Sequence, residues 1–451
     1  MADIKTAVTD IKLKELINER KWVALREEVK DIPAPDLADL ILSLDKPDRI
    51  LVFRLLPRDQ ASEVFASLEP SYRDDLLMDL SDEETRVLLA DLKPDDRTDL
   101  LEELPGQVVQ RMLNLLKPED LREAIGLLGY PEESVGRLMT PDYVAVRSFW
   151  TIGKALEHIR TKGKESETIN VIYVTDAKWK LLDALELRKF ILADPEDHVE
   201  EIMDYNYVSI LVTEDRENAV QLIKRYDLEV LPVVDSEGIL LGIVTVDDVM
   251  DVAEEEATED FHKTAAVAPL KLSYPETGVM GLFKRRIGWL LFLVFLNLVS
   301  SGVIAAFEKA LSKAIVLAFF LPLLADSGGN VGSQSATIII RALAVGEIST
   351  KDWLKALSKE LGVGLLLGAT MGVASWALGF IRGDWKVGLV VGLSMILIVL
   401  IANTIGLVLP MLLTKLKLDP ATASSPLLTT IIDSAGLLIY FTIAGLILHL
   451  F

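Results

Sequence analysis

The stretch PATASSPLLTTIIDSAGLLIYFTIAGLILHLF, residues 420–451, is an apolar segment of membrane length with a carboxylate, Asp433, near its middle. An ionised carboxylate at the centre of a membrane helix costs about 2.5–3.5 kcal/mol on insertion scales, so such residues usually face a water-filled path or a partner. The simpler alternative is a carboxylate that stays protonated or hydrogen-bonded to a neighbouring helix. A second acid, Asp326, lies in the apolar residues 314–340. Two intramembrane acids favour an ion path.

Five stretches reach the roughly 20 residues that cross a membrane: 287–307, 314–340, 361–381, 387–414 and 420–451. Nine basic residues flank these spans on one side and four on the other. By the positive-inside rule, the large N-terminal half is cytoplasmic and the C-terminus lies outside. The sequence therefore predicts a multi-pass protein of the cell (plasma or inner) membrane, in contact with membrane lipid.

The second span contains Pro322, Gly328, Gly329 and Gly332, which predict an unwound segment. Irregular backbone at membrane depth is tolerated where it lines a cavity, and its free carbonyls can hold a cation. The side chains expected to line a path are Asp326, Asn330, Ser333, Gln334, Asn403 and Ser425.

The charge of the chain is divided sharply between its two halves. Residues 1–283 carry a net charge of −27, and residues 284–451 carry +5. An acidic surface argues against nucleic acid as a partner and suits cations instead. The chain has no cysteine and four scattered histidines, so a zinc cage is not expected. No apolar signal-peptide core is visible near the start.

Residues 1–135 contain an internal repeat. A leucine recurs every twelve residues, at Leu44, Leu56, Leu68, Leu80, Leu92, Leu104, Leu116 and Leu128. A proline follows most of these leucines, where it ends one helix and can start the next. We expect short helices of about eight to ten residues stacked into a superhelix whose core is the leucine row. The acids Asp74, Asp75, Asp95, Asp96, Asp99, Glu102 and Glu103 are expected largely on exposed faces. They form either a solvated surface or, with another acidic domain, a cation site.

Residues 136–256 contain a longer duplication. Residues 137–146 match 201–210, and residues 169–191 match 228–250, with Asp176 and Asp235 in register. Each copy predicts the order strand–helix–strand–strand–helix. This arrangement, and the segment LPVVDSEGILLGIVTVDDV in particular, resembles a tandem CBS pair, an α/β fold.

The resemblance to a CBS pair implies an adenine nucleotide, such as ATP, in the cleft between copies. In the second copy Thr245 and Asp248 match the ribose-contacting positions. The first copy carries Asp183, Glu186 and Lys189 where Gly, Ser or Thr, and Asp are usual. We therefore expect nucleotide binding at the second copy.

The segment 247–263 continues the last CBS helix as an acidic linker, and residues 257–283 lead on to the membrane. At helical spacing Asp248, Asp251, Glu255 and Glu259 share one face. Like charges four residues apart destabilise a helix, and a hard divalent ion with oxygen ligands would compensate. A merely solvated linker is the alternative; the position next to the membrane favours a coupling element.

The order of these parts, with SGGNVGSQSATIIIRALAVGEI (327–348) and SPLLTTIIDSAGLLIYF (425–441), resembles the MgtE family of magnesium channels over essentially the whole chain. The resemblance implies an all-α superhelical domain, a CBS pair, a linker helix and a transmembrane domain of five helices over residues 284–451. It also implies a homodimer in which both Asp433 side chains and the Thr429 carbonyl hold hydrated Mg²⁺, with Ser425 where relatives often have Asn. The implied sensing residues are Glu63, Asp95, Asp99, Asp227, Asp248, Asp251, Glu256, Glu259 and Asp260.

The expected function is a Mg²⁺-selective uptake channel, not an enzyme. At low cytosolic Mg²⁺ the acidic parts repel one another; at high Mg²⁺ they become compact and the linker helices close the pore. A CBS-controlled secondary transporter or exporter of a divalent cation is the main alternative. A remote one is an intramembrane aspartyl protease, because Asp326 and Asp433 each begin an Asp-Ser pair and could form a dyad.

Overall fold

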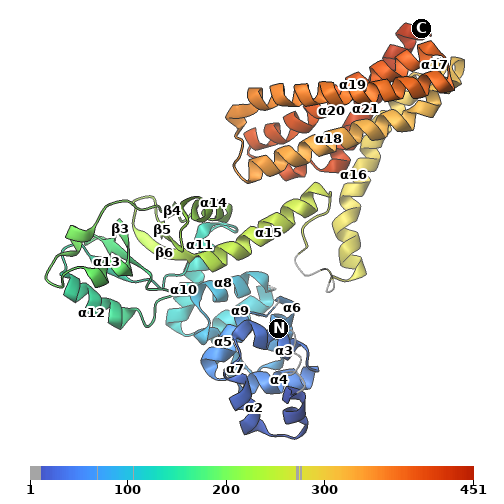
Figure 1. Cartoon of the computed structure of the whole chain (residues 1–451). Helices are drawn as coiled ribbons and strands as arrows, with labels where there is room; N and C mark the ends of the chain where they lie inside the picture. The colour runs from blue at the N-terminus through green and yellow to red at the C-terminus, as the bar shows by residue number, and fades with distance from the viewer. Residues whose placement is uncertain (1–11, 69, 105, 271–273, 275–276, 451) are drawn as a thin grey trace. The chain divides into compact units, whose positions relative to one another are not determined.

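The computed structural model of the chain describes residues 12–68, 70–104, 106–270, 274 and 277–450. Contacts divide the chain into two units, Met1–Glu254 and Glu255–Phe451, and each unit is considered by itself (Figure 1). The start of the chain, residues 1–11, and Pro105 of the repeat lie outside the described residues, as do the side chains of Pro70 and Glu103.

The first part of unit 1 is a row of short helices, as the twelve-residue repeat predicts. Their lengths run from eight to eleven residues. Most begin at or next to a proline, whose fixed φ suits a first helical turn. The helices are α2 (Trp22–Val29), α3 (Ala34–Leu42), α4 (Lys46–Leu55), α5 (Arg58–Ala66), α6 (Pro70–Asp79), α7 (Asp82–Asp91), α8 (Pro94–Glu103), α9 (Gly106–Leu115) and α10 (Pro118–Leu128).

The leucine row forms the core of this superhelix. Seven of the eight repeated leucines, from Leu44 to Leu116, are buried; Leu128 is half-buried, and its neighbour Leu127 takes the buried place. Leu56, Leu92 and Leu104 are the C-cap residues of α4, α7 and α8. These leucines therefore lie at the turns between successive helices. Alternate helices lie against each other, α3 on α5, α5 on α7 and α7 on α9. The prediction of stacked short helices around the leucines is confirmed.

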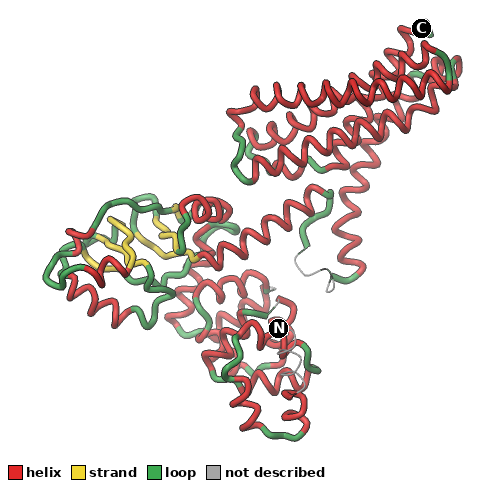
Figure 2. Tube along the Cα trace, in the orientation of Figure 1, coloured by secondary structure: helices red, strands yellow, loops and turns green. Residues whose placement is uncertain are grey.

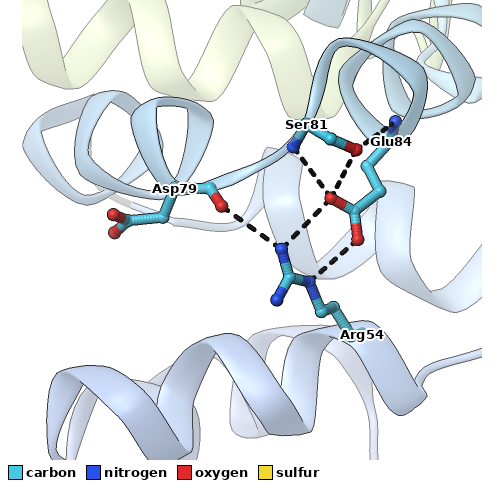
Figure 3. Close-up of polar contacts among 4 residues, drawn as sticks. All are labelled: Arg54, Asp79, Ser81 and Glu84. Atoms are coloured by element: carbon cyan, nitrogen blue, oxygen red, sulfur yellow. Dashed lines mark hydrogen bonds and ion pairs between the residues drawn. The ribbon is translucent and has the colours of Figure 1, made fainter.

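Polar contacts fix the ends of these helices. Ser81 caps α7, and Glu84 returns the contact by accepting the backbone N–H of Ser81 at 2.8 Å (Figure 3). Arg54 of α4 donates to Glu84 Oε1 at 2.8 Å and to the Asp79 carbonyl at 3.3 Å. One arginine therefore ties the end of α6 and the start of α7 to α4.

The second part of unit 1 contains two three-stranded sheets, where all of the described strands lie (Figure 2). In each sheet the first strand runs parallel to the second, and the second runs antiparallel to the third. The order strand–helix–strand–strand–helix is confirmed for both copies. The elements are α11 (Val135–Leu138), β1 (Ala145–Arg147), α12 (Ile152–Lys162), β2 (Val171–Thr175), β3 (Leu181–Glu186) and α13 (Leu187–Leu192), then η1 (Val199–Ile202), β4 (Ile210–Leu211), α14 (Arg216–Tyr226), β5 (Val230–Val234), β6 (Leu240–Thr245) and α15 (Val246–Thr264).

The duplication extends to single hydrogen bonds. Asp176 Oδ1 accepts the backbone N–H groups of Lys178 and Lys180, and Asp235 Oδ1 accepts those of Glu237 and Ile239. The two aspartates therefore build the same turn before the third strand of each copy, as their register in the sequence predicts.

Unit 2 holds five helices long and apolar enough to cross a membrane. They correspond to the five predicted spans, and α18, α20 and α21 share one apolar core. The α19–α20 contact is lined by glycines; a Cβ at Gly379 would lie 2.8 Å from the Gly388 Cα. The elements are α16 (Val279–Ala306), α17 (Glu308–Lys313), η2 (Ile315–Phe320), α18 (Leu321–Ala344), η3 (Thr350–Asp352), α19 (Trp353–Arg382), α20 (Trp385–Lys415), η4 (Pro420–Thr422) and α21 (Ser425–Leu448).

The expectation of an unwound second span is wrong. Helix α18 runs without interruption for 24 residues, because Pro322 lies in its first turn and its glycines serve packing. A Cβ at Gly332 would lie 2.1 Å from Ile432 Cδ1, and one at Gly329 would lie 2.7 Å from Thr429 Cγ2. The glycines let α18 approach α21 closely, as small residues do between membrane helices.

Candidate cation-binding sites

The two intramembrane acids stand on neighbouring antiparallel helices. Asp433 lies four residues, about one turn, after Thr429 on α21, and Thr429 packs against Gly329 of α18. Asp326 lies one turn before Gly329. The Asp326 and Asp433 carboxylates are near enough to interact electrostatically. The close α18–α21 contact therefore brings together two acids that are 107 positions apart in the sequence.

The Asp433 carboxylate has an unused acceptor. Its side chain is half-buried, and Oδ1 is shielded from solvent without a hydrogen-bond partner among the described residues. Asp326 is exposed and accepts from the Asn330 amide at 3.3 Å. A buried carboxylate oxygen without a donor is costly, and a cation would remove that cost. Carboxylate, hydroxyl and amide oxygens are the hard ligands that Mg²⁺ and Ca²⁺ prefer.

The predicted path residues separate into two groups. Asp326, Asn330 and Gln334 are exposed at helical spacing on α18, while Ser333 and Ser425 are half-buried. Asn403 lies elsewhere: it is 3% exposed on α20, and its amide donates to Glu360 Oε2 at 2.6 Å. The structure thus places Asn403 in a buried polar network and not on the polar face of α18.

Glu360 is a membrane carboxylate that the sequence reading did not select. It directly precedes an apolar stretch of 21 residues, so it looked like a residue flanking the span. In the structure it accepts hydrogen bonds from Ser335 at 2.9 Å as well as from Asn403. The signal that could have identified it is the pairing of an acid at the edge of the third span, Glu360, with an amide inside the fourth span, Asn403.

A second acidic group lies in unit 1, between α8 and the start of α15. Asp95 was expected on an exposed face but is 8% exposed, and its Oδ1 has no partner among the described residues. Burial, with the repulsion of Asp248 and Asp96, raises the pKa of Asp95 to about 8. Burial also raises the pKa of Asp248 to about 6. Helix α8 begins at Pro94, so Asp95 and Asp96 lie in its first turn. There Asp95 is near Asp248 of the CBS pair.

Basic side chains border this group. Arg73 pairs with Asp99 at 3.0 Å, and Lys93 pairs with Glu167 of the first CBS copy at 2.7 Å. Asp99 and Asp251 are exposed, and the pKa of Asp251 is raised by partial burial and by neighbouring acids that include Asp99. In this arrangement the Asp99 carboxylate forms an ion pair with Arg73, whereas no ion pair of Asp95 is found among the described residues.

The remaining sensing candidates are more dispersed. Glu63 is exposed and lines an open groove together with Asp96. Asp227 is exposed and ends α14 in the left-handed conformation. Glu256, Glu259 and Asp260 are half-buried on α15. The structure therefore does not bring all the predicted sensing residues together.

Within unit 2, the end of α15 is tied to the segment before α21. Lys263 Nζ lies 2.6 Å from Asp419 Oδ2 and also pairs with Glu259. Burial lowers the pKa of Lys263, but its hydrogen bonds to Asp419 and Glu259 outweigh that effect and hold it above its usual value. Asp419 in turn caps η4 by accepting the Ala421 N–H at 2.7 Å. Partial burial and the nearby Asp419 raise the pKa of Asp260.

The nucleotide candidates differ between the two copies. Thr245 donates to Asp248 at 2.6 Å at the junction of β6 and α15. In the first copy, Asp183 is fully buried and accepts the backbone N–H groups of Asp204 and Tyr205 at 2.9 and 3.0 Å. Lys189 pairs with Asp204. Asp183 and Lys189 thus have structural partners of their own, while Glu186 is exposed.

Neither acidic group is a preformed cage. In the described part of the chain, no three Asp, Glu or His side chains converge on one point. Each group offers two carboxylates, which fits an ion such as Mg²⁺ that keeps several of its waters and takes one or two carboxylates.

Taken together, acidic helical repeats, a CBS pair and five membrane-length helices with paired acids define a multi-pass membrane transport protein with regulatory domains. The MgtE family model, a divalent cation transporter, matches residues 321–443; the MgtE intracellular N domain matches residues 32–133, and a CBS domain matches residues 199–255. The chain belongs to the MgtE family.

Relatives and solved structures agree with this assignment. The magnesium transporter MgtE of Thermus thermophilus is 42% identical over 97% of this chain and 98% of its own length. The Bacillus subtilis magnesium transporter MgtE is 36% identical over 72% of this chain and 71% of its own. A crystal structure of the cytosolic domain of the Mg²⁺ channel MgtE in complex with ATP is 40% identical, covers 54% of this chain and 99% of that chain, and has a TM-score of 0.52. The soluble part of a magnesium transporter, 28% identical, covers 56% and 99%, with a TM-score of 0.53.

Proposed function

We propose that this protein is a Mg²⁺-selective channel for uptake, closed by cytosolic Mg²⁺ that binds its acidic domains. The observation that carries the proposal is the buried oxygen Oδ1 of Asp433, which has no hydrogen-bond partner among the described residues and lies near Asp326 in the membrane. Relatives named as magnesium transporters support Mg²⁺ as the transported ion.

The ion path runs between two copies of the chain. Asp326, Asn330 and Gln334 form a polar row on a membrane helix, and such a row is stable only against a partner or a water-filled path. In a homodimer the two Asp433 carboxylates and the Thr429 carbonyls surround hydrated Mg²⁺, with Ser333 and Ser425 beside them. The polar row then faces the path and not lipid.

Gating uses the acids of the superhelix, the CBS pair and α15. The proposed sensing residues are Glu63, Asp95, Asp99, Asp227, Asp248, Asp251, Glu256, Glu259 and Asp260. Asp95 and Asp248 face each other with raised pKa values, so the compact arrangement holds repelling groups. A divalent cation would supply the charge that neutralises them. Only a higher affinity for the compact state can make Mg²⁺ favour it.

The signal travels along α15. This helix is continuous from the end of the second CBS copy to Thr264, and its last turn is tied to Asp419 before α21. Asp248 and the residues next to the membrane domain therefore belong to one helix. The excess of basic residues on one side of the spans supports a cytoplasmic position for the acidic domains and an outside position for the C-terminus.

An adenine nucleotide binds the second CBS copy through Thr245 and Asp248. A relative's cytosolic domain that was crystallised with ATP supports this part of the proposal. Calorimetry on residues 136–256 should detect one site per chain, and Thr245→Ala with Asp248→Ala should remove it. Two sites of similar affinity would mean that Asp183, Glu186 and Lys189 allow binding at the first copy.

The main test is Mg²⁺ flux and current through purified protein in liposomes at varied internal Mg²⁺. Unitary currents that disappear as internal Mg²⁺ rises are the expected result. Saturable flux without unitary currents, coupled to a proton or sodium gradient, would favour the secondary transporter. Flux that is independent of internal Mg²⁺ would remove the sensor from the proposal.

A further inference from the structure

A buried polar network joins three of the membrane helices. Glu360 of α19 accepts, through a single oxygen Oε2, the Asn403 amide of α20 at 2.6 Å and the Ser335 hydroxyl of α18 at 2.9 Å. The Asn403 amide also donates to the Glu360 backbone carbonyl at 2.7 Å. Ser335 and Asn403 are each 3% exposed. Hydrogen bonds at this point therefore join α18, α19 and α20, which Figure 1 labels in the membrane-length part of the chain.

This point differs in kind from the other contacts of α18. Gly328, Gly329 and Gly332 pack against apolar and methyl groups of α20 and α21. Such contacts give close approach but little directional preference between membrane helices. In the described part of the chain, Ser335 is the one side chain of α18 with a hydrogen bond to another membrane helix; its hydroxyl lies 2.9 Å from Glu360 Oε2 and 3.2 Å from the Asn403 backbone carbonyl oxygen. A directional bond can set rotation where close packing does not.

The position of Ser335 on α18 determines how its hydrogen bond affects the rotation of this helix. Ser335 is nine residues after Asp326, and at about 100° per residue the two lie on opposite sides of the helix. A bond that holds Ser335 toward α19 and α20 therefore holds Asp326 and Asn330 away from them. The exposed positions of Asp326, Asn330 and Gln334 agree with this orientation.

We propose that Glu360 is a positioning residue for the ion path, which sets the rotation of α18 by accepting hydrogen bonds from Ser335 and Asn403. This inference rests on the proposed function, in which the opposite face of α18 lines the path. Glu360 itself does not touch the ion. Its role is to keep the Asp326 side of α18 turned toward the path while the helix remains packed against α21.

The proposal predicts which substitutions are tolerated. The side-chain carbonyl of glutamine can accept both hydrogen bonds, so Glu360→Gln should preserve the position of α18. Glu360→Ala removes both bonds to Oε2 but leaves the Ser335 hydroxyl near the Asn403 carbonyl oxygen, whereas Ser335→Ala removes the bonds of this hydroxyl to both α19 and α20. Lys359→Ala is the matched control, because Lys359 is the exposed ionisable neighbour on the same helix.

The first measurement is Mg²⁺ flux in liposomes. Ser335→Ala should lower it by about ten- to a hundredfold, as loss of the outer partners of metal ligands does. Glu360→Ala should lower it less, because the bond from Ser335 to the Asn403 carbonyl remains. Glu360→Gln and Lys359→Ala should stay within about threefold of the parent chain. If Glu360→Gln is as impaired as Glu360→Ala, the charge of Glu360 and not its hydrogen bonds matters, and the proposal is wrong.

The second measurement reports α18 rotation without relying on transport. The chain has no cysteine, so Gln334→Cys introduces a single reporter on the polar face. Its reaction rate with a charged, water-soluble thiol reagent should fall in the Glu360→Ala and Ser335→Ala backgrounds and recover in Glu360→Gln. An unchanged rate in Ser335→Ala, which removes a small hydroxyl and leaves Glu360 and Asn403 paired, would overturn the proposal.

The two measurements separate this inference from the proposed function. If the parent chain carries no Mg²⁺ in liposomes, the proposed function fails, while the labelling rates still report whether Glu360 sets the position of α18. If the parent chain conducts and the labelling rates do not respond to Ser335→Ala, the function stands and the positioning role falls.

Discussion

Two carboxylates, Asp433 in the membrane and Asp95 in the superhelix, share one property. Each has a buried oxygen without a hydrogen-bond donor among the described residues. Each also lies near a second acid, Asp326 or Asp248. An unpaired buried acceptor costs about 1–3 kcal/mol, more if it is charged, so folding tolerates it only where it serves another purpose. Both positions therefore suit transient neutralisation by a cation.

Asp433→Ala should abolish Mg²⁺ flux and leave the protein folded, because it removes a carboxylate from the proposed path and breaks no hydrogen bond found among the described residues. Asp433→Asn keeps the shape but loses the charge, so flux should also fall steeply. Fluorescent Mg²⁺ uptake into liposomes measures both. Thr442→Val is the control on α21: Thr442 is exposed, and its hydroxyl bonds only the Leu438 carbonyl of its own helix in the described contacts. Normal uptake through either Asp433 variant would remove Asp433 from the mechanism.

The raised pKa of Asp95 predicts how pH affects the metal-free protein. The pKa is about 8 in the folded state against a usual value near 4, so between about pH 4 and 8 the folded state binds more protons than the unfolded state. Stability of the α8–α15 region is therefore greatest at the acidic end of this window and falls as pH rises toward 8. Thermal unfolding at several pH values, with and without Mg²⁺, measures this dependence.

The stabilisation by Mg²⁺ should accordingly be larger at pH 8 than at pH 5.5, because more of the carboxylates are ionised at pH 8. Asp95→Asn is the control and should flatten the pH dependence of the metal-free protein. A stability that rises with pH over the same window would contradict the assignment of Asp95 as a buried acid facing Asp248.

At the scale of elements, the membrane helices fit together through glycines. A Cβ at Gly406 of α20 would lie 2.5 Å from the Gly332 carbonyl oxygen and 3.1 Å from the Ala336 nitrogen, both of the α18 backbone. Backbone atoms cannot move aside as a flexible side chain can. The α18–α20 distance, and so the position of the polar face of α18, depends on the absence of a side chain there.

Gly406→Ala should therefore destabilise the membrane domain by about 1–3 kcal/mol, the usual effect of overpacking. Gly362→Ala on α19 is the matched control, since no other atom lies within 4 Å of its added Cβ. Alanine also has the higher helix propensity, so this control should be neutral or stabilising. Thermal unfolding in detergent compares the two. Equal effects would show that the α18–α20 contact is not tight.

For the whole molecule, the division of charge is the dominant feature. Residues 1–283 carry −27, yet the superhelix and the CBS pair contact each other in unit 1 through α8, where Lys93 forms an ion pair with Glu167. Repulsion between exposed charges is screened within about 8 Å at physiological salt, whereas a coordinated cation acts directly at the carboxylates. When acidic residues are replaced, the loss of carboxylate ligands for the cation should therefore affect gating more than the reduced repulsion does.

The variant with Asp248, Asp251, Glu256 and Glu259 all changed to Ala should stay open at high internal Mg²⁺. Current recordings at varied internal Mg²⁺ measure this, and protection of the acidic domains from protease by Mg²⁺ should weaken in parallel. A variant that is closed at every Mg²⁺ concentration would mean that repulsion was the dominant effect, contrary to the proposed sensor.

The local features of this protein follow from its sequence. The twelve-residue leucine repeat, the duplicated strand–helix order and the five apolar stretches each reflect a short-range pattern, and each predicts the elements observed. Helix length, strand order and membrane spans depend on periodicity and on proline placement, which are visible along the chain. The sequence also singles out Asp433 as a candidate, because a lone acid in an apolar stretch is conspicuous.

Only the tertiary structure decided which residues meet. The glycines of the second span predicted unwinding on their own, but packing against Thr429 and Ile432 keeps α18 helical. Asp95 resembled its exposed acidic neighbours until docking of α8 buried it. Glu360 and Asn403, 43 positions apart, form a hydrogen bond that no local pattern encodes. Burial and pairing depend on contacts between distant segments, so the chemistry of these side chains is fixed by the fold and not by their sequence neighbours.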